Sequence, residues 1–402
     1  MASARRSLTV GALGGVLVLA VTACGAADGP GARTATGTAG TTAARPRATA
    51  PAATVHVEPA DGASDVKPSG TLKVTAAGGR LTTVKVTGRD GREVPGKVTA
   101  DGLSWAPDGA LAVSEQYRVS AQATDAEGLV TTVGSSFSTL TPSRRTGAYD
   151  NVTDNATYGV GMIVSLRFRK PVKNRAEIEK GVVFETSDGT VVEPHWFDDG
   201  RVDFRPQAFW TPRTTVTVHY RLKSVEVAAG TYGDLDEDVH FTVGRSRVTT
   251  ADVATHRMTV VENGQTVDTV KFTAGKPGFD SWNGTMVIEA MERTTRMSSD
   301  GVSGIRAGDE YDLDDVPHAM RLTDTGTYVH GNSWAPSAIG RSNASHGCLG
   351  ISDTRYGSSG TDAGRFYGAS MIGDVVTVVN SRGPKVGASN GLSGWNTDWS
   401  AW

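Results

Sequence analysis

The sequence predicts a mainly β protein that is divided into several domains. A chain of 402 residues is too long for one small domain and suits two or three compact units. Its 49 glycines stand among frequent threonines and valines, and this mixture of turn-forming and β-branched residues favours sheet over helix. Short alternating runs broken by Asp-Gly, Gly-Gly and Asn-Gly pairs recur along most of the chain, as in strands joined by turns.

The N-terminal segment, residues 1–23, has the features of a signal peptide. Arg5 and Arg6 precede an apolar run from Leu8 to Val21, which is 14 residues long. A membrane-spanning helix needs about 20 residues, so the run is too short to cross a bilayer. Small residues lead directly to Cys24, and this ending resembles the bacterial lipobox, which implies cleavage before Cys24 and lipid attachment to its sulfur. A plain secretory signal with an incidental cysteine is the alternative.

Residues 24–53 follow as a predicted disordered linker. They consist mainly of Ala, Gly, Thr and Pro with scattered Arg, and large apolar side chains are almost missing. Such a segment cannot bury a core, so we expect a flexible tether between the lipidated cysteine and the folded part.

Residues 54–140 and 141–244 are each expected to form an immunoglobulin-like β-sandwich. In the first, runs such as Leu81–Val86 alternate with turn signals such as Asp90-Gly91. The second shows the same pattern, for example at Val216–Tyr220. Neither range carries a cluster of chemically reactive residues, so we interpret both as spacers, with binding of wall glycans as the alternative.

Residues 245–381 are predicted to form a third, mostly β domain. An alternating pattern around Asn263-Gly264 is a strong hairpin signal. Further strands are expected at 284–289, 319–322, 327–330 and 374–379, with short helices at most at 353–357 and 363–367. Residues 382–402 form a tail rich in tryptophan, which we expect to dock on the third domain rather than to bind a partner protein.

The charge balance argues against one class of function. The chain has 40 Lys and Arg residues against 43 Asp and Glu residues. A nucleic-acid-binding protein needs a basic face, so no nucleic acid is expected as a partner.

The number of cysteines in the chain bears on the role of Cys348. Exported proteins usually pair their cysteines, but this chain has only Cys24 and Cys348. If Cys24 carries lipid, Cys348 is an unpaired thiol in an oxidising compartment. A catalytic thiol is therefore favoured over a buried structural one.

The segment from His330 to Cys348 contains the parts of a Cys–His pair. His330 ends a predicted strand, and a loop rich in Gly, Ser and Asn leads back to Ser345-His346-Gly347-Cys348. A cysteine becomes a nucleophile when a base lies within hydrogen-bond reach. Glycines beside the cysteine let backbone N–H groups converge on one point, as an oxyanion hole requires.

At these residues the sequence resembles the L,D-transpeptidase (YkuD-like) family. The family motif is a histidine followed some 14 to 17 residues later by Ser/Thr-His-Gly-Cys, and here 14 residues separate His330 from Ser345. Two immunoglobulin-like modules and a Trp-rich end are similar to actinobacterial members. The resemblance implies a lipid-anchored acyltransferase at the outer face of the cell membrane, acting in the cell wall without a cofactor. Its partners would be peptidoglycan stem peptides and, through the anchor, the membrane.

The family also implies roles for single residues. Cys348 would attack the carbonyl of the diamino acid at position three of a tetrapeptide stem and expel the terminal D-alanine. His330 would take the thiol proton, oriented by the carbonyl of Gly331, where many relatives have serine. The acceptor amine of a neighbouring stem would then resolve the thioester, giving a 3→3 cross-link. Backbone amides of the motif would form the oxyanion hole, namely those of His346, Gly347 and Cys348. Residues expected at the substrate cleft are Tyr311, Met320, Ser333, Trp334 and Ser345.

Some points stay open. The His346 ring is either catalytic or a structural part of its loop, and Ser345 is also expected to hydrogen-bond within that loop. The sequence departs from the family pattern at two places. Many relatives have asparagine or arginine at the position of Gly350, and the family's usual Thr-Pro-x-Gly is replaced by Trp-Asn-Gly-Thr at 282–285. Both departures leave substrate preference, rather than catalysis, open. A zinc site built from the cysteine and the two histidines is conceivable, but the resemblance argues against any metal. The competing functions are an L,D-carboxypeptidase, with water as acceptor, and a non-catalytic wall-binding lipoprotein.

Overall fold

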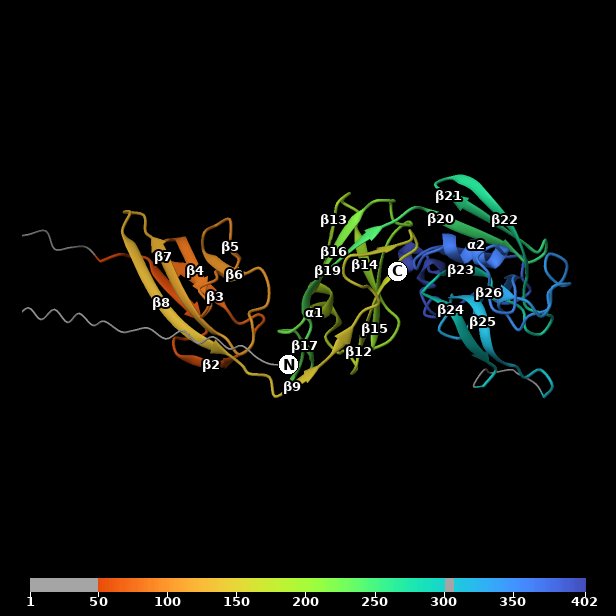
Figure 1. The fold of residues 1–402 in the computed structure, drawn as a ribbon. Coiled ribbons are helices and arrows are strands. Elements are labelled where there is room, and N and C mark those ends of the chain that lie inside the picture. Colours follow the sequence, from red (N-terminus) through yellow and green to blue (C-terminus); the bar gives the residue numbers. More distant parts are fainter. Residues whose placement is uncertain (1–49, 301–306) are drawn as a thin grey trace, which may run out of the picture. The chain divides into compact units, whose positions relative to one another are not determined.

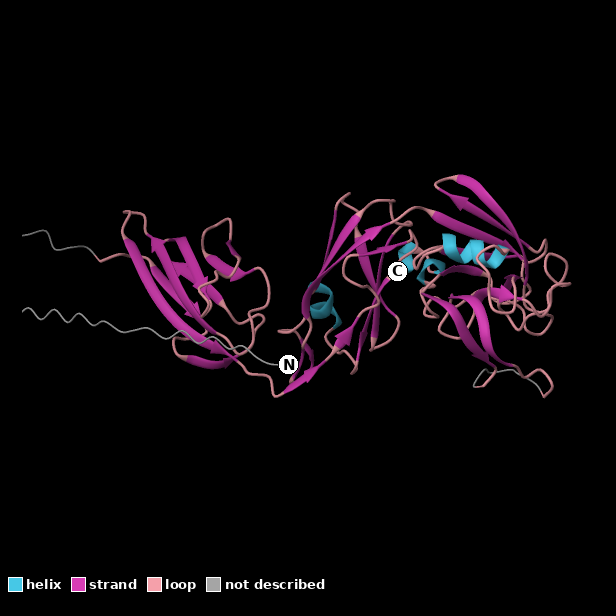
Figure 2. Cartoon of the chain, in the orientation of Figure 1, coloured by secondary structure: helices cyan, strands magenta, loops and turns pink. Residues whose placement is uncertain are grey.

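The computed structural model describes residues 50–300 and 307–402. The predicted signal peptide, Cys24 and nearly all of the predicted linker lie outside these residues. Strands account for most of the regular structure, as Figure 2 shows, so the mainly β prediction is confirmed. None of the helices within the described ranges is long and apolar enough to cross a membrane.

The first sandwich consists of two four-stranded sheets. One has the order β1 (Thr54–Glu58), β3 (Lys73–Ala77), β6 (Ser104–Pro107), β5 (Gly96–Val98). The other has the order β2 (Ala63–Val66), β8 (Val130–Thr139), β7 (Gln116–Thr124), β4 (Arg80–Thr87). Along β7 every second residue is buried, from Tyr117 to Ala123. This period of two places one face on a core that includes Trp105, as a sandwich requires.

The second sandwich is built in the same way and adds a small sheet and a short helix, α1 (Arg175–Lys180). Its first sheet has the order β10 (Ala148–Tyr149), β12 (Val164–Phe168), β15 (Arg201–Pro206), β14 (Val192–Trp196). Its second has the order β11 (Ala156–Tyr158), β19 (Asp236–Val243), β16 (Thr215–Arg221), β13 (Val182–Thr186). The small sheet has the order β17 (Glu226–Ala228), β18 (Thr231–Gly233), β9 (Arg144–Thr146).

The third domain is organised around a nine-stranded sheet (Figure 1). Its order is β23 (Gly284–Val287), β28 (Val375–Val379), β20 (Arg247–Asp252), β21 (Arg257–Glu262), β22 (Gln265–Thr273), β27 (Leu349–Ser352), β26 (Tyr328–Asn332), β25 (Asp312–Arg321), β24 (Ala290–Ser298). The predicted helix at 363–367 is α2 (Asp362–Ala369), whereas the chain at 353–357 forms no helix. Thr361 caps α2 by accepting a hydrogen bond from the Gly364 N–H.

The hairpin predicted at Asn263-Gly264 joins β21 to β22. Both residues have positive φ angles, 48° and 81°, and Glu262 pairs with Gln265 directly beyond them. A two-residue turn of this kind requires left-handed backbone at both positions, which explains why Asn-Gly occupies it.

The third domain also contacts the second sandwich through backbone and side chains. The N–H groups of Gly159 and Gly161 donate to the carbonyls of Ile372 and Gly373, both at 2.8 Å. Val287 and Val375 of the third domain belong to the same buried apolar cluster as the core of the sandwich.

The Trp-rich tail docks on its own chain, but its tryptophans contact the second sandwich rather than the third domain. It ends in two short 3-10 helices, η1 (Gly394–Asn396) and η2 (Trp399–Ala401). The Trp402 indole N–H donates to the carbonyl of Glu193 at 2.9 Å, and that of Trp395 donates to Gly161 at 2.8 Å. Other residues of the tail contact the third domain. Val386 packs in its core, Asn390 hydrogen-bonds Thr325, and the Asn396 side chain hydrogen-bonds Thr285.

Arg205 of β15 holds this tail. Its guanidinium lies 4.1 Å from the Trp402 ring centroid, 4.8 Å from that of Trp395 and 5.3 Å from that of Trp399. It also donates to the carbonyl of Thr397 at 2.8 Å. Burial lowers the pKa of Arg205 to about 10, so the side chain remains a cation at neutral pH.

An Arg205→Ala substitution is therefore expected to lower stability. Loss of the cation–π contacts and of a charged hydrogen bond costs about 3 kcal/mol. This corresponds to a fall in melting temperature of roughly 6 to 12 °C, measured by calorimetry. The exposed Arg169 of the same sandwich provides the control, since Arg169→Ala should leave the melting temperature nearly unchanged. Equal effects of the two substitutions would contradict a specific role for Arg205.

Candidate active site

The two halves of the predicted Cys–His pair come together because β26 and β27 are parallel neighbours. His330 is paired with Gly350, and Val329 with Leu349, so Cys348 lies immediately before the strand that flanks His330. Both residues line one pocket of about 990 Å³. The long loop between the strands is thus the crossover that a parallel pair needs.

His330 is buried and held in one orientation. Its Nδ1 lies 2.9 Å from the carbonyl oxygen of Gly331, and its ring stacks on Trp334 at 5.5 Å between centroids. A carbonyl only accepts hydrogen bonds, so Nδ1 carries the proton and Nε2 of the neutral ring is left free to act as a base. Burial lowers the pKa of His330, an effect that the hydrogen bond to Gly331 opposes. The prediction that Gly331 orients His330 through its carbonyl agrees with this contact.

Cys348 is unpaired and partly accessible. Its Sγ lies 3.6 Å from the Gly326 carbonyl oxygen, which accepts from the thiol. Exclusion of water around the sulfur raises the pKa of the Cys348 thiol to about 11, against the opposing effect of a backbone hydrogen bond from Tyr328. With the imidazole pKa lowered and the thiol pKa raised, the resting pair is a neutral thiol and a neutral base.

The Ser345–Cys348 loop is fixed by its own hydrogen bonds. The Ser345 hydroxyl donates to the carbonyl of Cys348 at 2.6 Å and accepts from the N–H of Gly347 at 3.1 Å. Gly347 has a φ of 118°, which strains any residue with a side chain, and its carbonyl accepts from the Ser281 hydroxyl at 2.7 Å. The predicted local role of Ser345 is therefore present. The Gly347 N–H, however, is engaged by Ser345, whereas an oxyanion hole requires a free donor.

His346 forms part of the pocket wall. Its ring packs against Phe279 and Tyr311, with centroids at 4.8 and 4.9 Å. Burial and the nearby Lys276 cation lower the pKa of His346, while Asp309 opposes this shift. The aromatic contacts hold the ring in the pocket wall, which favours the structural role for His346 over the catalytic one.

The pocket contains three of the five residues predicted for the substrate cleft. Tyr311, Trp334 and Ser345 line it, and Trp334 is 48% exposed. Met320 does not, because it pairs with Val329, whose side chain points to the face of the sheet opposite His330. Met320 is fully buried in the core there, so its assignment is wrong. Ser333 is likewise outside the lining of this pocket, between two residues that belong to it.

The sequence analysis missed several residues of the pocket wall. Tyr328 and Asn332 lie two positions before and after His330 on β26, and period-two alternation would have placed both on the same face. The others come from distant parts of the chain and carry no local signal. They include Phe279, Trp282 and Arg296.

Gly350, one of the two departures from the family pattern, is explained by packing. A Cβ at this position would lie 2.9 Å from the Asn332 side chain and 3.1 Å from Thr273. The segment 282–285 departs for a different reason. The Asn283 side chain donates to the carbonyls of Ser381 and Gly383 and thereby ties this segment to the chain that follows β28.

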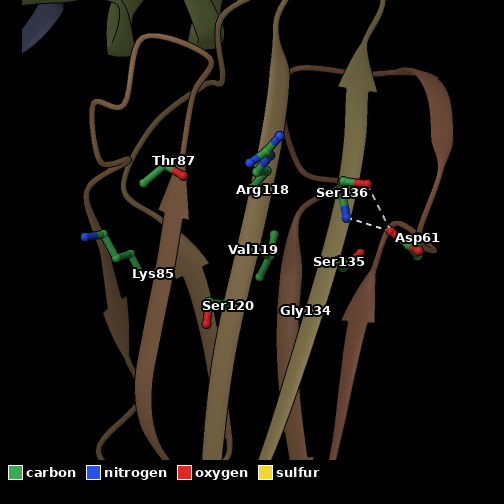
Figure 3. A pocket seen from close by; sticks show the side chains of 9 residues that line it. All are labelled: Asp61, Lys85, Thr87, Arg118, Val119, Ser120, Gly134, Ser135 and Ser136. Atoms are coloured by element: carbon green, nitrogen blue, oxygen red, sulfur yellow. Dashed lines mark hydrogen bonds between the residues drawn. The ribbon is translucent and has the colours of Figure 1, made fainter. Parts of the chain in front are cut away.

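A second pocket lies on the first sandwich (Figure 3), over the sheet that contains β4, β7 and β8. Most of its lining residues are polar or charged, and the Asp61 carboxylate accepts from both the N–H and the hydroxyl of Ser136. The lining holds no cysteine or histidine. Across the described ranges, no group of three or more His, Cys, Asp or Glu residues could hold a metal ion.

Comparisons with known proteins find similar domains and relatives. The model of the L,D-transpeptidase catalytic domain matches residues 246–378, and that of the bacterial Ig domain matches residues 63–226. The chain is 31% identical to L,D-transpeptidase 2 of Mycobacterium tuberculosis over 344 residues, covering 85% of this chain and 82% of that protein. It is 27% identical to L,D-transpeptidase 5 of the same species, covering 88% and 76%. Among solved structures, the L,D-transpeptidase LdtMt1 in complex with imipenem is similar, with 27% identity, 58% and 99% coverage and a TM-score of 0.49.

Proposed function

Because the chain belongs to the L,D-transpeptidase family of acyltransferases, we propose that it forms 3→3 cross-links in peptidoglycan through a thioester on Cys348. The observation that carries this proposal is the parallel pairing of β26 and β27, which brings His330 and Cys348 into one pocket. The function of the whole chain is thus assigned to one strand pair and the loop that precedes β27.

The chemistry follows from the protonation states. His330 Nε2 takes the proton of the Cys348 thiol as the sulfur attacks the carbonyl of the third residue of a tetrapeptide stem. The C–N bond to the terminal D-alanine breaks, and the protonated His330 returns its proton to the leaving amine. The amine of a second stem then attacks the thioester, with His330 accepting its proton, and the thiol is regenerated. Backbone N–H groups of His346 and Cys348 are assigned to the oxyanion, since that of Gly347 is engaged.

One incubation separates this activity from its competitors. Purified tetrapeptide muropeptide is incubated with the protein, and the products are analysed by liquid chromatography and mass spectrometry. A cross-linked dimer together with free D-alanine is the expected result. Tripeptide without dimer would indicate an L,D-carboxypeptidase, and unchanged substrate would indicate a binding protein.

The location of the protein is part of the same proposal. The positive and apolar segments of residues 1–23, followed by Cys24, support export and lipid attachment at the outer face of the cell membrane. A lipid-bearing Cys24 would also explain why Cys348 has no partner cysteine. A Cys24→Ala variant is expected to move from the membrane fraction to the soluble extracellular fraction. Unchanged membrane association would contradict the anchor.

A further inference from the structure

We propose that Asp353 is a positioning residue for the catalytic base, because its carboxylate fills the space beside Gly331 and fixes the carbonyl that orients His330. The inference rests on the proposed function of Cys348 and His330. It concerns a residue that follows β27 and does not line the pocket.

The carboxylate of Asp353 occupies the place of a side chain at position 331. A Cβ built on Gly331 would lie 2.2 Å from Asp353 Oδ2 and 2.9 Å from Asp353 Cβ and Cγ. Gly331 follows His330 directly, so this contact is on the face of β26 opposite the His330 ring. The same glycine presents its carbonyl oxygen to His330 Nδ1 at 2.9 Å. Asp353 thus packs against the residue that sets the tautomer of the base.

Asp353 is itself held rigidly. Its side chain is fully buried, and a buried carboxylate is stable only when its oxygens receive hydrogen bonds. Oδ2 accepts from His318 Nδ1 at 2.7 Å. Oδ1 accepts from the Thr361 hydroxyl at 2.9 Å, and from the N–H groups of Thr354 at 2.7 Å and Ser358 at 3.1 Å. Four donors, one on β25 and three in the segment between β27 and α2, leave the carboxylate one orientation.

The backbone reinforces this position. The N–H of Asp353 donates to the carbonyl of Asn332 at 3.2 Å, where β26 ends. Gly331 pairs with Ile351 in the same ladder. Asp353 is therefore held against β26 by a backbone hydrogen bond and by the packing of its side chain. Any displacement of its carboxylate opens space behind Gly331. That space would let the Gly331 peptide rotate and release His330.

A double-substitution experiment on the full chain tests this. The readout is the rate constant for acylation by a carbapenem, followed by loss of the β-lactam absorbance. Gly331→Ala alone creates the clash and Asp353→Ala alone opens the space, so each is expected to slow acylation by about 30-fold, because small displacements of a catalytic group are costly. The combined variant places the new methyl group in the vacated space and should be at least fivefold faster than either single variant.

Two further measurements distinguish a general loss of stability from a loss of the orientation of His330. Ser370→Ala removes a hydrogen bond at the end of α2 without touching Asp353, so it should lower the melting temperature and leave the acylation rate unchanged. Nitrogen NMR of the imidazole should show Nδ1 protonated in the parent chain and a mixture of tautomers in Asp353→Ala.

The outcomes are distinct. A combined variant as slow as the product of the two single effects would overturn the proposal, as would an Asp353→Ala variant with the parent rate or the parent tautomer. If the parent chain itself is not acylated, the proposed function fails, and the tautomer measurement still decides whether Asp353 positions His330.

Discussion

A Cys348→Ala variant of this protein is expected to form no covalent adduct with a carbapenem, whereas the parent chain gains the mass of one carbapenem molecule. The strained amide of a β-lactam presents a carbonyl that the Cys348 sulfur attacks, and the resulting thioester is retained on the protein. Alanine offers no nucleophile, so acylation stops entirely rather than slowing down. Mass spectrometry of the intact protein measures the adduct directly.

The chain provides a matched control for this prediction. Cys24 and Cys348 are its only cysteines, so Cys24→Ser removes the other thiol and should leave the adduct in place. An adduct that persists in Cys348→Ala would contradict the assignment of Cys348 as the nucleophile. Loss of the adduct in Cys24→Ser with Cys348 intact would show that the carbapenem reacts with Cys24 instead.

Features set by neighbouring residues could be predicted from the sequence. The Asn263-Gly264 hairpin depends on two residues that tolerate left-handed backbone, and the alternation of β7 depends on a period of two. The Cys–His pair could also be predicted, because His330 and Cys348 lie close in the chain. The fixed spacing of its motif carried the family resemblance.

Features set by strand register could not be predicted. Met320 precedes the histidine strand and was assigned to the cleft, but its pairing with Val329 turns it to the opposite face. The position of Asp353 could not be predicted either. Its contact with Gly331 depends on β27 lying parallel to β26, and no pattern around either residue indicates it.

The tail illustrates a further limit. Its composition indicated that it docks on an apolar surface, but the choice of surface depends on Arg205, which lies nearly two hundred positions away. Cation–π contacts of about 0.5 to 2 kcal/mol each add to the burial of the three indole rings at this surface. Sequence patterning identifies the tryptophans and gives no information on the cation they meet.

Replacing His330 by glutamine is expected to lower the acylation rate by a factor of about 10² to 10⁴ at neutral pH, the usual contribution of a general base. The thiol pKa of about 11 leaves only about one thiolate in 10⁴ at pH 7, so attack depends on removal of the proton in the same step. Glutamine retains hydrogen-bonding capacity but cannot accept this proton. His346→Ala is the control, since His346 lies in the same pocket and its ring is packed between Phe279 and Tyr311. A larger loss in His346→Ala than in His330→Gln would reverse the assignment of the base.

The acylation rates of the parent chain and of the His330→Gln variant should depend differently on pH. In the parent, acylation requires neutral His330, whose pKa is lowered by burial, so the rate should fall only on the acid side, with a midpoint below the ordinary histidine value of about 6.5. Above that midpoint the parent rate should be flat towards pH 9. In His330→Gln the thiolate fraction sets the rate, which should rise about tenfold per pH unit until the pH approaches the thiol pKa of about 11. The two profiles therefore converge at high pH. A variant profile parallel to that of the parent would show that His330 does not take the thiol proton.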